Sequence, residues 1–101
     1  MSAAEGSAPG NVVTDNAARS RFELALADGV AFIDYRRDGA HYLLLHAEVP
    51  PALRGRGIAA QLTAAALQLV RAQGGSVEAR CSYVAQFIAQ NAQYQDLLAR
   101  S

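Results

Sequence analysis

The sequence predicts a fold of the α/β (α+β) class, a mixed sheet with helices in the order β-β-β-α-β-α. Three observations predict this order. Two Asp-Gly pairs divide residues 21–49 into three strand-like segments. Residues 58–73 carry apolar side chains at helical spacing. A short strand-like segment at 76–81 and a second helical pattern follow them.

The N-terminal residues 1–18 are predicted to form a flexible tail. They are rich in Ala, Ser, Gly and Asn, and they carry few large apolar groups to offset the entropy of ordering. At 101 residues the chain is long enough for one core but not for two. We therefore expect one domain over residues 19–101, with order beginning near Ser20.

The three strand-like segments before the first helix form an antiparallel meander. Phe22, Leu24 and Leu26 alternate with more polar neighbours, as in a half-buried strand. Tight turns at 28–29 and 38–39 lead into strands at 30–36 and 41–49. Two prolines at 50 and 51 end the third strand, because neither residue can donate to a ladder.

The helical half of the chain begins after these prolines. The apolar face of the first helix is predicted to comprise Ile58, Leu62, Ala65, Ala66, Leu69 and Val70. Gly74 and Gly75 end that helix. Residues 76–81 then return as a strand parallel to the third, through a right-handed crossover. Ser82 is the expected N-cap of a second helix, and Tyr94, Leu97 and Leu98 pack a final turn.

The turn between the third strand and the first helix predicts an anion site. Residues 53–59 read LRGRGIA, and the start of a helix offers unpaired backbone N–H groups. Gly55 and Gly57 allow a close approach and a positive φ, while Arg54 and Arg56 add positive charge. Solvated arginines are the alternative, but their place in a glycine-rich turn favours a phosphate-bearing ligand.

Composition excludes several other classes of protein. The formal net charge is zero, which disfavours non-specific binding to nucleic acid or to an anionic membrane. One cysteine and two histidines exclude an internal disulfide and make a metal site improbable. The sequence lacks a transmembrane-length apolar run and a signal peptide, so we expect a cytoplasmic protein. Neither G-x-G-x-x-G nor the lysine-bearing phosphate loop occurs, which disfavours both nucleotide folds.

The glycine-arginine turn also carries a resemblance to a known family. Residues 54–59 fit the Q/R-x-x-G-x-G/A motif of the GNAT N-acetyltransferase superfamily. The wider segments EVPPALRGRGIA at 48–59, CSYVAQFI at 81–88 and YQDL at 94–97 resemble its small, single-domain YjdJ-type branch. The resemblance spans about Arg21 to the C-terminus and implies a compact GNAT-like mixed sheet. Asn91 departs from it, because the branch usually has a histidine there.

The resemblance implies that acetyl-CoA is the co-substrate. The backbone amides of the turn, with Ile58 and Ala59, would cradle the pyrophosphate of coenzyme A. Main-chain groups near Ala47 and Val49 would contact the pantetheine arm, where the strand segments 46–49 and 77–81 splay apart. The implied activity is acetyl transfer to a primary amine. Larger members of the superfamily carry helices between their first two strands that help to bind the acceptor. In this sequence the turn at 28–29 takes the place of those helices. The acceptor therefore stays unidentified.

Cys81 is the first candidate for the chemistry. A thiol near a helix N-terminus, beside Arg80, has its thiolate form favoured. In the resembled branch a cysteine at this point lies near the thioester, as a base or as an acyl-accepting nucleophile. The alternative is a small thiol that fills a gap in the core.

Three further residues are candidates. His46 and Glu48 share one strand face, opposite Leu45, Ala47 and Val49, and either could accept the proton of the amine. A polar pair at a half-solvated sheet end is the alternative. By the resemblance Tyr94 would protonate the departing thiolate, whereas the alternative is a core anchor.

The expected partners are acetyl-CoA and an amine acceptor, with no nucleic acid, no membrane and a monomeric or weakly dimeric chain. A coenzyme A or acyl-CoA binding module with little or no catalysis is the alternative function. A small interaction domain that uses the arginines alone is disfavoured by the neutral charge and the few aromatic residues.

Overall fold

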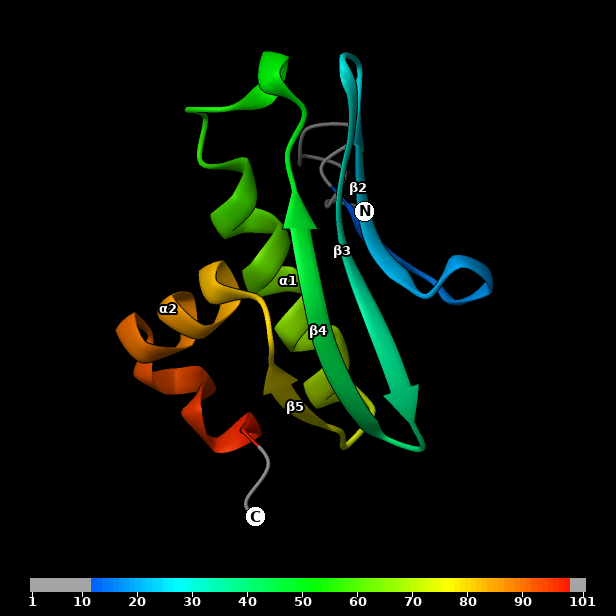
Figure 1. Cartoon of the computed structure of the whole chain (residues 1–101), viewed down its shortest axis with the longest axis vertical. Helices are drawn as coiled ribbons and strands as arrows, with labels where there is room; N and C mark the ends of the chain where they lie inside the picture. Colours follow the sequence, from blue (N-terminus) through cyan, green and yellow to red (C-terminus); the bar gives the residue numbers. More distant parts are fainter. Residues whose placement is uncertain (1–11, 99–101) are drawn as a thin grey trace, which may run out of the picture.

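A single five-stranded sheet organises the protein, whose computed structural model describes residues 12–98 (Figure 1). The strands lie in chain order, and β4 and β5 are the one parallel pair. The predicted mixed sheet is confirmed, with one additional strand at its start. The strands are β1 (Val13–Asn16), β2 (Arg21–Leu26), β3 (Gly29–Asp38), β4 (His41–Glu48) and β5 (Ser76–Ala79). The α-helices are α1 (Ile58–Ala72) and α2 (Ser82–Gln90), and 3₁₀ turns cover Ala17–Arg19, Pro51–Leu53 and Ala92–Leu97.

Strand β1 corrects the predicted N-terminal tail. It pairs antiparallel with β2 and is followed by a 3₁₀ turn, so a tail without regular structure is wrong for residues 13–18. Polar contacts hold this strand, since the Tyr35 hydroxyl donates to Asp15 at 2.5 Å and Asn16 donates to Glu23 at 3.2 Å. The composition of the segment gives no sign of such contacts. Residues 1–11 of the predicted tail lie outside the described part of the chain.

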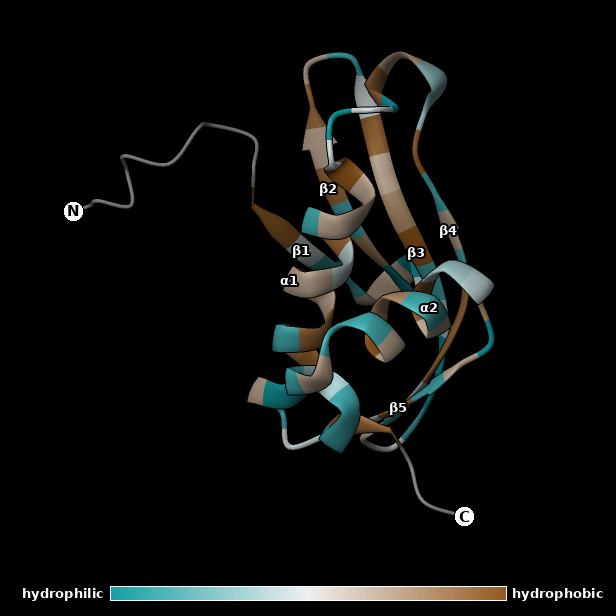
Figure 2. Ribbon diagram, turned by 90° about the vertical axis from the view of Figure 1, so that its left-hand side faces the viewer, coloured by the Kyte–Doolittle hydropathy of each residue, from teal (hydrophilic) through white to brown (hydrophobic). Residues whose placement is uncertain are grey.

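Both helices lie on one face of the sheet, and the core lies between them and that face (Figure 1, Figure 2). Along β2 and β3, buried residues alternate with more exposed ones over most of each strand, as expected of strands with one face against the core. On α1 the buried face includes Leu67 and Thr63, whereas Ala65 and Leu69 are only half-buried, so the predicted face is rotated slightly. The largest fully buried side chains include Tyr42, Phe22, Leu24, Ile33, Leu44, Leu62, Leu67 and Ile88.

A β-bulge in β4 decides which way its last residues point. Tyr35 pairs with Leu44 and Asp34 pairs with His46, so Leu45 is an extra residue without a partner in the ladder. The bulge reverses the alternation of β4, so Ala47 turns towards the core while His46 turns away from it. Leu45 is 39% exposed, so the prediction that it shares a strand face with Ala47 is wrong.

Strands β4 and β5 separate at Leu44. Their parallel ladder ends where Leu44 pairs with Ala79. The N–H groups of Arg80 and Cys81 then both donate to the Leu44 carbonyl, at 2.9 and 3.0 Å, and the chain turns into α2. The last residues of β4 thus have no ladder to β5. On β4 this separation agrees with the splay expected at 46–49, whereas on β5 the expected start at Val77 is wrong, because the ladder continues to Ala79.

Candidate active site

The turn before α1 exposes backbone at the start of a long helix. Gly55 and Gly57 have φ of +83° and +73°, a left-handed conformation that other residues rarely adopt. Gly57 is the N-cap of α1 and gives no side-chain hydrogen bond to the first turn. A Cβ at either glycine would meet nothing within 4 Å, so the space beside the turn is open. The positive φ expected at these two glycines is confirmed, and the anion site itself stays a prediction.

A groove of about 180 Å³ runs from this turn towards α2. It joins three separate segments: the end of β4, the start of α1 and the first turn of α2. Of the residues predicted to bind the ligand, Ala47 and Arg56 do not line it. The lining residues are Val49, Leu53, Arg54, Gly55, Gly57, Ile58, Ala59, Ala60 and Tyr83.

Arg54 joins the end of β4 to the glycine turn. Its Nε donates to the Val49 carbonyl at 3.0 Å, so the side chain folds back across the two prolines. The bond holds in place the loop that carries Gly55 and Gly57. Arg54 therefore has a structural contact in addition to the phosphate contact expected of it.

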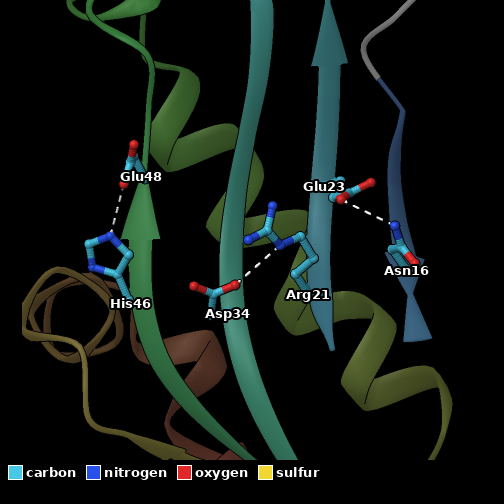
Figure 3. Close-up of polar contacts among 6 residues, drawn as sticks. All are labelled: Asn16, Arg21, Glu23, Asp34, His46 and Glu48. Atoms are coloured by element: carbon cyan, nitrogen blue, oxygen red, sulfur yellow. Dashed lines mark hydrogen bonds and ion pairs between the residues drawn. The ribbon is translucent and has the colours of Figure 1, made fainter. Parts of the chain in front are cut away.

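His46 and Glu48 form an exposed pair on the sheet face that the helices leave open (Figure 3). His46 Nε2 lies 3.1 Å from Glu48 Oε1, and their side chains are 58% and 53% exposed. The His46 ring also meets the edge of Phe32, with 6.4 Å between centroids. The prediction that the two residues share one strand face is confirmed. They lie on β4 beyond the point where it leaves β5.

Cys81 lies at the point where the strands separate. It occupies the N-cap position of α2, so the prediction of Ser82 as the N-cap is wrong by one residue. The thiol is free and half-buried, and its residue packs against the core. Cys81 does not line the groove. Its backbone bond to Leu44 fixes it beside β4.

Tyr94 is 5% exposed and packed into the core. Its hydroxyl accepts a hydrogen bond from Gln68 at 3.4 Å, and its ring lies 5.8 Å from that of Phe87. Gln68 is ten residues beyond the start of α1, about 15 Å along the helix axis. The structure does not bring Tyr94 to the groove.

An ion pair holds the segment that carries Tyr94. Arg71 donates to both oxygens of Asp96, at 2.7 and 3.0 Å, and to the Gln93 carbonyl. The hydrogen bonds from Arg71 hold the pKa of the Asp96 carboxyl below its usual value.

Comparison with known proteins identifies the family. The family model for GCN5-related N-acetyl-transferases matches residues 21–97. The chain belongs to this family. No curated protein matches the sequence. An NMR solution structure of a GCN5-like candidate N-acetyltransferase from Staphylococcus aureus is similar over 93% of each chain, with 21% identity and a TM-score of 0.69. At that identity the likeness shows the fold alone.

Acetyl transfer is the general activity of GCN5-related N-acetyltransferases, and acetyl-CoA is their usual co-substrate. The glycine turn fits the diphosphate of that co-substrate, since it offers open backbone at a helix start. Within residues 12–98 no three His, Cys, Asp or Glu side chains gather as a metal site requires. Neither described helix has the length and apolar character needed to cross a membrane.

Tyr83 is a groove residue that the sequence pattern did not single out. It lies in the first turn of α2 and lines the groove opposite the glycine turn, 37% exposed. The one signal in the sequence was its spacing from Phe87, because aromatic residues four apart share a helix face. That spacing could not show which element lies across from them.

Proposed function

We propose that this protein binds acetyl-CoA in the groove at the start of α1 and transfers the acetyl group to a primary amine. One observation carries the proposal: two left-handed glycines bring open, uncapped backbone to a helix start. Backbone N–H groups there suit a diphosphate, and the helix dipole favours negative charge. Membership of the GCN5-related family supports acetyl transfer as the reaction.

Several groups would hold the co-substrate. The N–H groups from Gly55 to Ala59 would bind the diphosphate, with Arg54 and Arg56 adding charge. Main-chain groups near Ala47 and Val49 would bind the pantetheine arm, because β4 has no ladder to β5 there. When bound, coenzyme A supplies the acetyl group as a thioester. Backbone donors near Val49 would stabilise negative charge on the thioester oxygen.

His46 is the base we propose for the amine proton. If its Nε2–H donates to Glu48, then Nδ1 keeps a lone pair and can accept a proton. Glu48 would stabilise the charge that His46 gains. Both residues are exposed at the strand end that β5 leaves unpaired, so an acceptor can reach them.

Cys81 is the alternative reactive group. In the covalent route the Cys81 thiolate would attack the thioester carbonyl, release coenzyme A as its thiolate and then pass the acetyl group to the amine. In the other route Cys81 would accept the amine proton through water. The position at the N-cap of α2 favours the thiolate. Mass spectrometry after incubation with acetyl-CoA separates the two routes, because only the covalent one leaves an acetyl group on Cys81.

A binding module with little turnover is the second candidate function. The observation that favours it is the buried Tyr94, whose hydroxyl is already engaged by Gln68. Tyr94 is the residue proposed to protonate the departing thiolate, and burial keeps it from that task. Steady turnover with a panel of amines counts against the module, whereas tight binding without turnover supports it.

A thermal shift experiment tests the binding proposal. Ligand at about 100 times its dissociation constant stabilises a protein by roughly 2.7 kcal/mol. For a domain of this size that should raise the melting midpoint by about 10 °C or more. We expect this shift with coenzyme A and acetyl-CoA and a smaller one with ATP. No shift with either form of coenzyme A would refute the proposal.

A further inference from the structure

Tyr83 stands out among the exposed apolar side chains of the described chain. It lines the groove, whereas Val30, Leu45 and Leu98 lie elsewhere. An aromatic ring with a polar tip suits a ligand that is part apolar and part hydrogen-bonding.

The groove lining combines two kinds of surface. Glycine backbone and the start of α1 offer N–H groups that suit a diphosphate. Val49, Leu53 and Tyr83 add apolar surface to the same groove. The pantetheine arm that leaves the diphosphate of coenzyme A carries methyl and methylene groups, a hydroxyl and two amides, and it ends in the thiol. Such an arm matches apolar surface that has hydrogen-bond donors beside it.

The Tyr83 side chain can supply both kinds of contact. Its ring packs near that of Phe87, with centroids 6.3 Å apart, and this contact limits its freedom. Between residues 12 and 98 no protein group accepts a hydrogen bond from its hydroxyl. Burial raises the pKa of this hydroxyl, so it carries its proton at neutral pH.

We propose that Tyr83 binds the pantetheine arm of coenzyme A, with its ring against the arm and its hydroxyl donating to an amide carbonyl. This inference rests on the proposed function and adds the residue that recognises the arm. The glycine turn then selects the diphosphate, and Tyr83 distinguishes coenzyme A from nucleotides that carry no arm.

Calorimetric titration with two ligands tests the assignment. The ligands are coenzyme A and adenosine 3′-phosphate 5′-diphosphate, which lacks the arm. Tyr83→Ala should weaken binding of coenzyme A by about tenfold and leave the nucleotide within about twofold. Tyr83→Phe keeps the ring and should weaken coenzyme A by about threefold. Leu98→Ala is the matched control, since Leu98 is 39% exposed and lies outside the groove.

Each other outcome overturns the assignment. Equal losses for both ligands would place Tyr83 at the phosphates, and unchanged binding of coenzyme A would remove it from the ligand. Failure of the unmodified protein to bind coenzyme A would instead refute the proposed function itself. If Tyr83→Ala does not fold, Tyr83→Phe still tests the assignment, because it keeps the ring. A thermal melt shows whether each variant is folded.

Discussion

The guanidinium of Arg54 donates a hydrogen bond through Nε to the carbonyl of Val49, 3.0 Å away. The bond spans the two prolines and ties Val49, which follows β4 and packs against the core, to the loop before α1. Two parts of the proposed binding site are thereby fixed to each other: the strand end for the arm and the glycine turn for the diphosphate.

Lysine substitutions should separate this positioning role from charge alone. Arg54→Lys keeps the charge but loses the Nε donor, so we expect coenzyme A to bind about tenfold more weakly. Arg56→Lys should bind within about twofold of the unmodified protein, because Arg56 makes no such bond and lies outside the groove lining. Calorimetric titration measures both. Equal affinities for the two variants would show that charge alone matters.

Two glycines with similar backbones offer a matched comparison. Gly57 at the start of α1 and Gly74 after its end have φ of +73° and +68°, and a methyl group at either position would meet nothing within 4 Å. Alanine at either position should cost about 1–2 kcal/mol of stability through the backbone alone. Only Gly57→Ala should also weaken binding of coenzyme A. Chemical denaturation and titration measure the two effects, and a binding loss with Gly74→Ala would contradict the assignment.

Thr63 is expected to lower the stability of the fold. It is fully buried on α1, and its hydroxyl has no hydrogen-bond partner among the described residues. Thr63→Val removes the unpaired hydroxyl and keeps the shape, so it should raise the free energy of unfolding by about 1 kcal/mol. Thr63→Ser keeps the hydroxyl and loses a methyl group, so it should be less stable than the unmodified protein. If Thr63→Val were less stable than the unmodified protein, the Thr63 hydroxyl would have to make a hydrogen bond in the folded state.

Tyr35 should make the protein sensitive to alkaline pH. Burial first, and then the hydrogen bond to Asp15, raise the pKa of Tyr35 above its ordinary value of 10.0. The folded protein therefore holds this proton more tightly than the unfolded chain does. That contribution is complete below pH 10 and is lost as the pH rises further. Above pH 10 the free energy of unfolding, measured by chemical denaturation, should fall less steeply with pH for Tyr35→Phe than for the unmodified protein. The same pH dependence for both proteins would contradict this.

Much of the fold was predictable because its signals are local. The Asp-Gly turns and the alternating apolar residues predicted β2 to β4, and helical spacing with Gly74 predicted α1. Strand β1 was missed because it is held by its ladder and by Asp15, whose partner Tyr35 lies 20 residues away. The bulge at Leu45 has no signature in the sequence, although it sets the direction of every later residue in β4.

The binding half of the site was predictable for the same reason. The glycine turn is contiguous, so its residues carry the anion-site geometry without help from distant elements. The chemical half depends on tertiary packing. The sequence could not show that Tyr94 lies in the core beside Gln68, or that Tyr83 lies across the groove from α1.

Amide NMR shifts during titration with coenzyme A locate the binding site residue by residue. Binding at the start of α1 predicts that the largest shifts occur at the N–H groups of residues 55–59. Tyr83 should shift with coenzyme A but not with adenosine 3′-phosphate 5′-diphosphate. Saturable shifts confined to other residues, or no shifts at millimolar ligand, would contradict binding at the start of α1.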